Sequence, residues 1–248
     1  MQFDFHSTRS ILVQRGGSTE LAKITRDQGA SKVLIVTDPG VLAAGLLEKA
    51  LPQFEALHIP VHIFSEVQAD PSVSIIEAAV KAAQDYQVDC IVGFGGGSSM
   101  DVAKLVALLS LGHEKLVDIY GIGNAKGPRL PLILVPTTAG TGSEVTKSSV
   151  VTVSESEKKG VLSPHLLPDL ALLDAELTLG LPAHVTAATG IDAMVHAIEA
   201  FTTKHLKNPI ADCLAKEALQ LLSKNLHRAV FTGGDIEARE NMLLGACL

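Results

Sequence analysis

The sequence contains no tryptophan, and aromatic residues make up only 4% of its 248 residues. Apolar residues nevertheless account for 47% of the chain, against 19% for charged residues. Disordered chains are poor in aliphatic residues, so this composition excludes disorder and indicates a globular protein with a core of Val, Ile, Leu and Ala. A chain of this length forms either one large α/β domain or two domains.

Cysteines are also scarce, and they follow no pattern typical of a disulfide framework or a zinc site. Cys90, Cys213 and Cys247 are odd in number and widely spaced, and each has apolar neighbours. We therefore expect buried thiols, in a protein of a reducing compartment.

Two further features are missing: a run of basic residues and a long apolar stretch. The formal net charge is −7, and no basic segment could neutralise a row of phosphates, which argues against nucleic acid as a partner. No stretch reaches the length of a transmembrane helix, and the N-terminus lacks the basic-then-apolar order of a signal peptide. The sequence thus predicts a cytoplasmic protein without membrane contact.

Short β-rich apolar runs alternate with helical segments in the first part of the chain. This alternation predicts an α/β fold, a Rossmann-like parallel sheet covered by helices. Strands are expected within residues 10–14, 32–37, 89–94, 130–136 and 170–174. After Pro182 the β-branched runs vanish and Ala, Leu and Met recur at helical spacing, so we place a boundary there, between an α/β domain (1–182) and an all-helical domain (183–248).

Two helix starts are indicated by capping residues. Ser18 is a candidate N-cap for a helix that ends near Gly29. Asp70 is placed to cap a second helix, with Pro71 in its first turn. The apolar face of that second helix would comprise Val73, Ile76, Val80 and Ala83.

The stretch GFGGGSSMDVAK (93–104) joins a buried strand to a helix expected over 99–110. Glycines at such a join let a phosphate approach main-chain N–H groups, and the helix adds the positive end of its dipole. The stretch therefore predicts an anion cradle, although glycine clusters also mark ordinary tight turns. It matches neither the order of an ATP-hydrolysing loop nor the standard G-x-G-x-x-G fingerprint.

Polar residues at two other strand ends bear on the same question. Asp38 ends the strand within 32–37, where an acid can accept hydrogen bonds from ribose hydroxyls and repel the 2′-phosphate of NADP. The loop PTTAGTGSE (136–144) offers short hydroxyl side chains suited to phosphate or carboxamide contacts. Each feature also has a purely conformational explanation, a strand-ending turn and a loop that satisfies its own backbone.

Asp192 and His196 are four residues apart on an expected helix, so they project from the same face. A carboxylate oxygen beside an imidazole nitrogen suits Fe²⁺, Zn²⁺ or a similar divalent ion. The alternative is a surface pair that contributes a few tenths of a kcal/mol, roughly. The apolar neighbours of the pair favour the metal, because burying an ionised Asp without a partner is costly.

Together, these stretches resemble the iron-containing (group III) alcohol dehydrogenase family. GGGSSMDVAK, PTTAGTGSEVT, SPHLLPDLALLDAELTLGLP and ATGIDAMVHAIEAF occur in that family's order, and the similarity covers essentially the whole chain. The resemblance implies an NAD-binding α/β domain and a helical metal-binding domain, with the active site between them. It implies that Asp192 and His196 bind a divalent metal, Fe²⁺ first and Zn²⁺ as the alternative, and that the dinucleotide is contacted by Asp38, Gly96, Gly97, Ser98, Asp101, Thr137, Thr138, Thr141 and Lys158. Lys104 would support the loop or face solvent.

The activity implied is that of an NAD-dependent, metal-dependent alcohol dehydrogenase or aldehyde reductase, which transfers hydride between a small alcohol and nicotinamide. A homodimer or higher homo-oligomer is expected for the full-length protein. No side chain is a clear general base. Two alternatives stay open: an NAD-binding module without catalysis, and a related enzyme such as a glycerol dehydrogenase, a maleylacetate reductase or a dehydroquinate synthase.

One departure from the family concerns the metal. Family members complete the site with two later histidines, whereas this chain ends at ENMLLGACL within an expected helix. We therefore expect a truncated product, an incompletely cloned chain or a partially read gene. The remaining histidines outside the matching motifs are expected at the surface or at helix caps: His113, His165, His184, His205 and His227.

Overall fold

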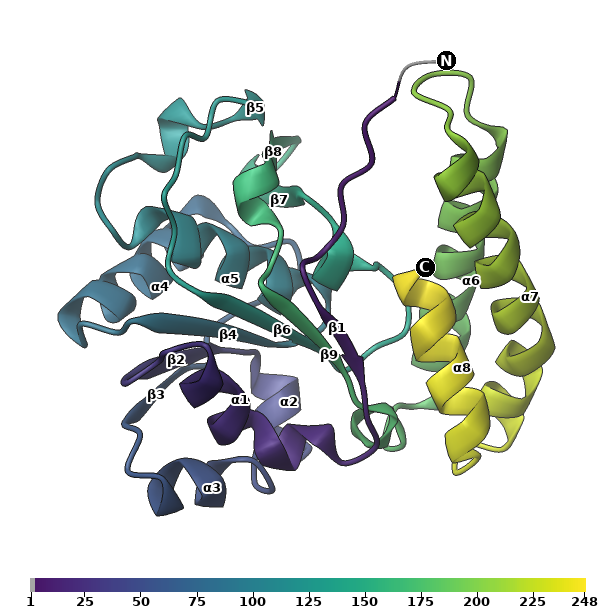
Figure 1. The fold of residues 1–248 in the computed structure, drawn as a ribbon, viewed down its shortest axis with the longest axis horizontal. Helices are drawn as coiled ribbons and strands as arrows, with labels where there is room; N and C mark the ends of the chain where they lie inside the picture. Colours follow the sequence, from purple (N-terminus) through teal and green to yellow (C-terminus); the bar gives the residue numbers. More distant parts are fainter. Residues whose placement is uncertain (1–2) are drawn as a thin grey trace.

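The computed structural model describes residues 3–248 and contains a six-stranded sheet whose strands all run parallel (Figure 1). The strand order is β1-β9-β6-β4-β2-β3. These strands are β1 (Ile11–Val13), β2 (Val33–Val36), β3 (Val61–Phe64), β4 (Cys90–Gly95), β6 (Leu132–Pro136) and β9 (Leu170–Leu173). The parallel α/β fold expected from the alternating pattern is confirmed.

Every residue of β2, β4 and β6 is buried, which explains why these strands are continuous apolar runs rather than alternating ones. Helices cover both faces of the sheet (Figure 1). One face carries α1 (Leu21–Asp27), α2 (Pro39–Ala43) and α3 (Leu51–Ala56), and the other carries α4 (Val73–Asp85) and α5 (Gly97–Leu109). Two separate apolar cores result, one on each side of the sheet.

A smaller three-stranded sheet lies beside α5, in the order β5-β8-β7. Its strands are β5 (Gly121–Ile122), β7 (Ser148–Ser154) and β8 (Glu157–Leu162), and β7 and β8 form an antiparallel hairpin. Short 3-10 helices connect the elements: η1 (Gly17–Glu20), η2 (Leu116–Asp118), η3 (Ser143–Val145), η4 (Pro164–Leu166) and η5 (Ala175–Thr178).

The rest of the chain is helical: α6 (Ala183–Thr202), α7 (Pro209–Phe231) and α8 (Ile236–Cys247). Asn208 caps α7 through its side chain, and Asp235 caps α8 in the same way. The three helices share a third apolar core, in which α8 is the helix closest to the edge of the large sheet (Figure 1). Among residues 3–248, no helix combines the length and the apolar character needed to cross a membrane.

Two of the expected helix starts are wrong. The Ser18 hydroxyl donates to Asp174 Oδ2 at 2.7 Å, and the residue lies in η1, so α1 begins only at Leu21. The chain around Pro71 pairs with β7 instead of beginning a helix, because the carbonyl of Pro71 accepts from the Thr152 amide at 2.9 Å. Asp70 therefore caps nothing, and α4 begins at Val73.

The expectation that all cysteines are buried is wrong for one of them. Cys90 and Cys247 are buried, whereas Cys213 is exposed. The buried stripe of α7 runs through Ala215 and Ala218, and Cys213 lies off this spacing on the solvent side of the helix.

Candidate functional site

The carboxyl ends of β2 and β4 lie side by side and form a topological switch point. From β2 the chain moves outward to β3, and it returns to β4 on the opposite side of β2. In open parallel sheets a crevice opens at such a point, outside the strand ends. Asp38 follows β2 and the glycines follow β4, so the fold brings these two sequence features to the same crevice.

Asp38 has two hydrogen-bond partners in the protein. Its Oδ1 accepts from the Val41 amide at 3.0 Å and caps α2, and its Oδ2 accepts from the Ser99 hydroxyl at 3.1 Å. Asp38 therefore has a conformational role, as the residue that caps α2. The side chain is only half-buried, so the same carboxylate also stays within reach of a ligand.

The three consecutive glycines differ in what requires them. A Cβ at Gly95 would lie 2.7 Å from the Ser99 hydroxyl at a φ of +156°, and one at Gly97 would lie 2.8 Å from Thr141 Cγ2. A Cβ at Gly96 would meet nothing closer than Thr138 Oγ1 at 3.6 Å, and the backbone there is extended. Packing within the protein thus explains Gly95 and Gly97 and leaves open space at Gly96.

Helix α5 begins directly after this open position, and no side chain among the described residues caps its N-terminus. The first amides of a helix have no intrahelical partner, and the helix dipole makes this end positive. An uncapped helix start next to a glycine without a packing role is the arrangement that a phosphate group fits.

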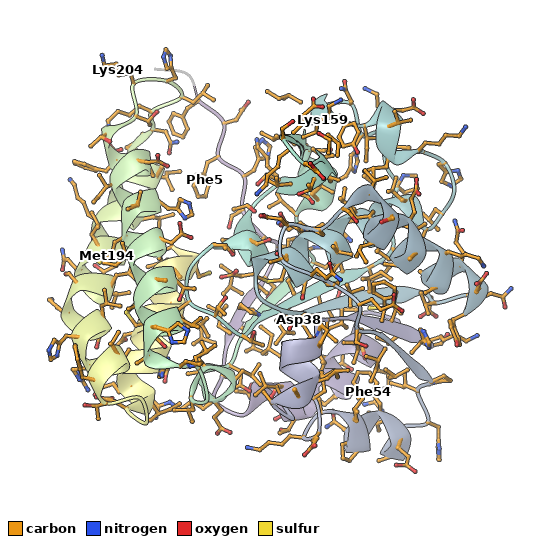
Figure 2. The ribbon with its side chains drawn as sticks, turned by 180° about the vertical axis from the view of Figure 1, so that it is seen from behind. Phe5, Asp38, Phe54, Lys159, Met194 and Lys204 are labelled. Atoms are coloured by element: carbon orange, nitrogen blue, oxygen red, sulfur yellow. The ribbon has the colours of Figure 1, made fainter. Side chains whose placement is uncertain are left out.

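A cavity of about 840 Å³ opens in front of this helix start. On one side it is lined by Gly97, Ser98 and Asp101, and on the other by α6, including His196. The N-terminal segment also borders it, and Figure 2 shows Phe5 between the helices and the sheet. The volume is in the range of cavities that hold a small ligand or cofactor.

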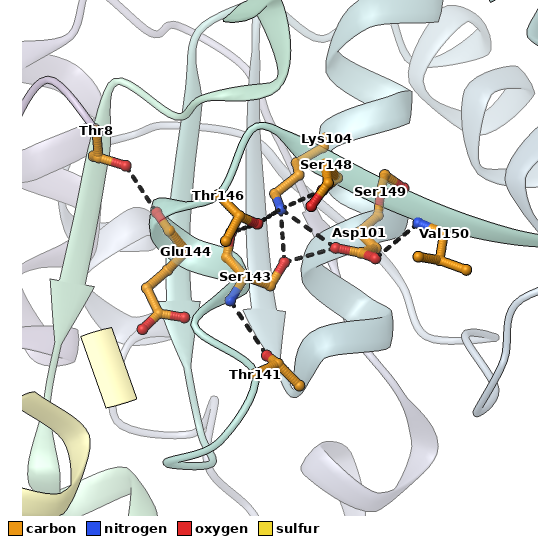
Figure 3. A network of polar contacts seen from close by, with 10 residues as sticks. All are labelled: Thr8, Asp101, Lys104, Thr141, Ser143, Glu144, Thr146, Ser148, Ser149 and Val150. Atoms are coloured by element: carbon orange, nitrogen blue, oxygen red, sulfur yellow. Dashed lines mark hydrogen bonds and ion pairs between the residues drawn. The ribbon is translucent and has the colours of Figure 1, made fainter. Parts of the chain in front are cut away.

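The loop between β6 and β7 forms another wall of the cavity and is fixed from behind by polar contacts (Figure 3). The ammonium of Lys104 donates to the hydroxyls of Ser143 at 2.7 Å and Thr146 at 3.1 Å. It also donates to the Ser148 carbonyl at 2.8 Å and contacts Asp101 Oδ1 at 3.3 Å. Lys104 is fully buried, so of the two expected roles the structure excludes the solvent-facing one.

Two ionisable groups near this loop have shifted pKa values. Burial lowers the pKa of Lys104, although Asp101 acts in the opposite direction. Burial raises the pKa of Glu144 to about 7, and the charge of Lys104 offsets only part of this effect. The Glu144 carboxylate points away from the Lys104 ammonium (Figure 3).

Several of the residues predicted to contact the dinucleotide lie around the cavity or the crevice. Thr138 is the residue nearest to the open position at Gly96, and Thr141 lies against Gly97. Thr137 is buried, and its amide donates to the Gly95 carbonyl at 3.0 Å. These hydroxyl residues thus follow β6 and stand next to the turn after β4.

Two other predicted residues are engaged with protein groups. Both oxygens of Asp101 accept hydrogen bonds, Oδ1 from Ser143 at 2.6 Å and Oδ2 from the Val150 amide at 3.0 Å. Lys158 lies on β8 and pairs with Asp70 at 2.6 Å, and Asp70 lines the cavity.

Asp192 and His196 lie one turn apart on α6, with 3.8 Å between Asp192 Oδ1 and His196 Nε2. Two ligands that each lie about 2.1 Å from one ion are at most about 4.2 Å apart, so the pair fits a shared cation. Both side chains are about half-exposed rather than buried among the apolar neighbours. Within residues 3–248 no third His, Cys, Asp or Glu joins them to form a group of metal ligands.

Ser143 was expected among the hydroxyl donors of the loop 136–144 for a phosphate or carboxamide, whereas its hydroxyl bonds Asp101 and Lys104. The position of Asp70 in this site was not predicted. The contact between Asp70 and Lys158 joins residues 88 positions apart, and no local pattern indicates it.

Comparisons with known proteins show which family this chain is similar to. The family model "Iron-containing alcohol dehydrogenase" matches residues 8–175, and the model of the C-terminal part of the Fe-containing alcohol dehydrogenase family matches residues 186–248. Alcohol dehydrogenase 4 of Schizosaccharomyces pombe is 39% identical over 232 residues, which cover 93% of this chain and 55% of the relative.

Two solved structures are similar over the whole chain. A 1,3-propanediol oxidoreductase matches with a TM-score of 0.95 at 33% identity, and the match covers 100% of this chain and 65% of that one. A sulfoacetaldehyde reductase from Bifidobacterium kashiwanohense in complex with NAD⁺ matches with a TM-score of 0.92 at 33% identity, with the same coverage of 100% and 65%. The chain thus spans between about half and two thirds of the length of these relatives.

Proposed function

Because the chain belongs to the iron-containing alcohol dehydrogenase family, we propose that it is part of an oxidoreductase that interconverts a small alcohol and its aldehyde, using NAD and a divalent metal ion. The similar proteins include alcohol dehydrogenases, a sulfoacetaldehyde reductase and a 1,3-propanediol oxidoreductase. In this proposal residues 1–182 bind the dinucleotide, and residues 183–248 begin the metal-binding part. The cavity between Ser98 and His196 joins the two.

The observation that carries the proposal is the open position at Gly96. Neither its backbone conformation nor its packing within the protein requires glycine, yet it immediately precedes an uncapped helix start. A diphosphate seated there would accept hydrogen bonds from the amides of Gly97 and Ser98. Thr138 and Thr141 would add hydroxyl donors, with Thr137 behind them in the same loop.

The choice of dinucleotide would depend on Asp38. Its carboxylate, fixed by the α2 amide and by Ser99, would accept hydrogen bonds from the ribose hydroxyls and repel a 2′-phosphate, which favours NAD over NADP. Asp101 would act indirectly, because both of its oxygens are already bonded to protein groups. Lys158 would reach the cofactor from the rim of the cavity, where Asp70 holds it.

The metal would be held by Asp192 and His196, whose spacing fits one shared ion. When bound, a divalent ion supplies Lewis-acid polarisation of the alcohol or carbonyl oxygen, with Fe²⁺ proposed first and Zn²⁺ second. The contribution of this chain would be to orient the reactants, since its glycine turn would hold the dinucleotide on one side of the cavity and α6 would present His196 on the other. No described side chain is assigned as a general base.

Isothermal titration calorimetry of this chain with NAD tests the proposal. Gly96→Ala has room for its methyl group within the protein, so the fold should be retained while NAD binding weakens by about tenfold or more. Gly180→Ala is the matched control, because a Cβ there meets nothing within 4 Å. Unchanged NAD affinity in Gly96→Ala would refute the assigned cofactor seat.

A second candidate is a nucleotide-binding module without catalysis. It is favoured by the fact that residues 3–248 supply two adjacent metal ligands but no group of three. NAD binding by a chain that retains no iron or zinc would support this alternative. Binding of both NAD and a metal ion would support the dehydrogenase, and a panel of alcohols would then separate it from glycerol dehydrogenases and maleylacetate reductases.

We also propose that the full-length protein forms a homodimer. Light scattering would measure its mass in solution.

A further inference from the structure

We propose that Lys104 is a positioning residue for the dinucleotide site. Its buried ammonium holds the loop 137–146 in the position in which Thr141 faces the glycine turn. This inference rests on the proposed binding of NAD at the same site. Lys104 itself does not line the cavity and would act through Ser143.

The side chain of Lys104 connects three segments that are distant in sequence. It begins on α5, reaches η3 through Ser143, and reaches the start of β7 through the Ser148 carbonyl. Thr146, between η3 and β7, supplies another acceptor. The loop is therefore fixed at several points by a single group, and the group comes from the helix whose N-terminus forms the proposed phosphate seat.

The hydroxyl groups around Lys104 are oriented by its charge. An ammonium group only donates, so Ser143 and Thr146 must accept from it and use their own hydrogens elsewhere. The Ser143 hydroxyl donates to Asp101 Oδ1 at 2.6 Å, and the Thr146 hydroxyl donates to the Ser143 carbonyl at 3.3 Å. Every bond in this network has a defined direction, which a neutral side chain at 104 would not impose.

Stability alone does not account for a lysine at this position. Burying an ammonium is costly, and the carboxylate it contacts, Asp101, is shared with Ser143 and Val150. The neighbouring buried positions of α5, such as Leu105 and Leu108, are filled by apolar side chains. Replacing the whole polar cluster by apolar side chains would cost no more stability, whereas removing Lys104 alone would leave Asp101 and the acceptors of the loop unpaired, so the charge points to a role in geometry.

The contacts lead from Lys104 to the proposed ligand in two steps. Lys104 holds the Ser143 hydroxyl, and the Ser143 amide donates to Thr141 Oγ1 at 3.3 Å. Thr141 in turn lies against Gly97, where an added Cβ would be 3.0 Å from the same Oγ1. Loss of the ammonium would therefore release the hydroxyl that is proposed to contact the dinucleotide.

The test compares Lys104→Met with Leu108→Ala, a control in which a buried side chain of the same helix, packed in the apolar core, is shortened. Calorimetry with NAD and thermal unfolding are measured for both. We expect Lys104→Met to bind NAD about tenfold more weakly, and the control to stay within about twofold of the unchanged chain even where it unfolds at a lower temperature. Equal NAD affinity in Lys104→Met and the unchanged chain would overturn the inference.

A second variant and a second measurement separate positioning from folding. Ser143→Ala removes the hydroxyl through which Lys104 holds residue 143, while the amide that contacts Thr141 remains. The double variant with Lys104→Met should lose no more affinity than the stronger single variant, because both act on one path. Fully additive losses would contradict that path. Where Lys104→Met fails to fold, Ser143→Ala alone decides by the same affinity measurement.

Hydrogen exchange of the loop, measured without any ligand, distinguishes this inference from the proposed function. Lys104→Met should speed amide exchange in residues 137–147 more than in α5. Leu108→Ala should leave the ratio of the exchange rates in these two segments unchanged. If the unchanged chain does not bind NAD, the proposed function fails. Unaltered exchange of the loop in Lys104→Met would overturn the positioning role independently.

Discussion

The carboxylate of Asp38 and the hydroxyl of Ser99 meet at 3.1 Å across the ends of two neighbouring strands. One residue follows β2 and the other belongs to the first turn of α5. Their hydrogen bond connects the carboxylate that is proposed to bind the ribose with the helix that is proposed to bind the diphosphate. The two halves of the proposed dinucleotide site are thus coupled through one contact.

Replacing Asp38 by Ala should change both stability and cofactor preference. The variant loses the cap of α2, which costs about 1 kcal/mol of unfolding free energy. It also removes the negative charge that disfavours a 2′-phosphate, so the ratio of NADP to NAD affinity should rise. Calorimetric titration with both dinucleotides measures the ratio. The control is Ser99→Ala, which keeps the charge and should keep the preference for NAD.

In the full-length protein, replacing His196 by Ala should abolish metal retention and turnover and leave NAD binding nearly intact, because the imidazole is one of the two adjacent ligand groups proposed on α6. Metal content after dialysis against iron or zinc is the measurement. His184→Ala, on the same helix, is the control and should retain the metal of the unchanged chain. The unfolding temperature should change little, since exposed pairs contribute at most about 1 kcal/mol. Equal metal content or unchanged turnover in His196→Ala would show that this histidine is no ligand.

The buried carboxyl of Glu144 predicts a pH dependence of stability. Its pKa is raised from 4.5 to about 7, mainly by burial, so between these values the folded state binds a proton that the unfolded state has lost. Stability from this group is therefore fully present below the lower value and is lost as the pH rises through the window.

Glu144→Gln should be more stable than the unchanged chain at about pH 8, by up to roughly 3 kcal/mol. The advantage should shrink as the pH falls toward 4.5, where the carboxyl of the folded chain is neutral. Urea unfolding at several pH values measures this. Glu155→Gln, at an exposed position, is the control and should show no such trend. An advantage that grows toward low pH would contradict the sign of the shift.

Close packing of α6 against its neighbours predicts that a side chain at Gly190 displaces its neighbours. A Cβ there would lie 2.5 Å from Leu226 Cδ1 and 2.8 Å from Met242 Cε. Gly190→Ala should lower the unfolding free energy by about 1 kcal/mol, because the ends of these two side chains must move aside in a packed core. Thermal unfolding measures the loss. A variant as stable as Gly180→Ala would show that the helices have room to spare.

The central strands could be predicted from the sequence, and the hairpin β7–β8 could not. Residues 90–95 are a continuous apolar run because the sheet is covered on both faces. Ser148–Ser154 alternates buried, half-buried and exposed residues and carries four serine or threonine hydroxyls among its seven residues. Such a strand is stabilised by its partners, and a single sequence does not show them.

In the site, positions next to one another in sequence were predictable, and contacts between distant segments were not. The glycine turn and the Asp192/His196 spacing are local patterns, and the structure places each where a ligand can approach. The contacts of Lys104 with Ser143, Thr146 and Ser148 depend on how α5 packs against η3 and β7. The pairing of Asp70 with Lys158 depends on the position of β8. Cys213 shows the same limit, because its exposure follows from which face of α7 the core selects.

The most direct measurement is a crystal structure of this chain soaked with NAD. We expect diphosphate density beside Gly96, within hydrogen-bond distance of the amides of Gly97 and Ser98, with the ribose near Asp38 and the nicotinamide end directed toward His196. A dinucleotide bound at another surface, with the space at Gly96 still empty, would contradict this expectation.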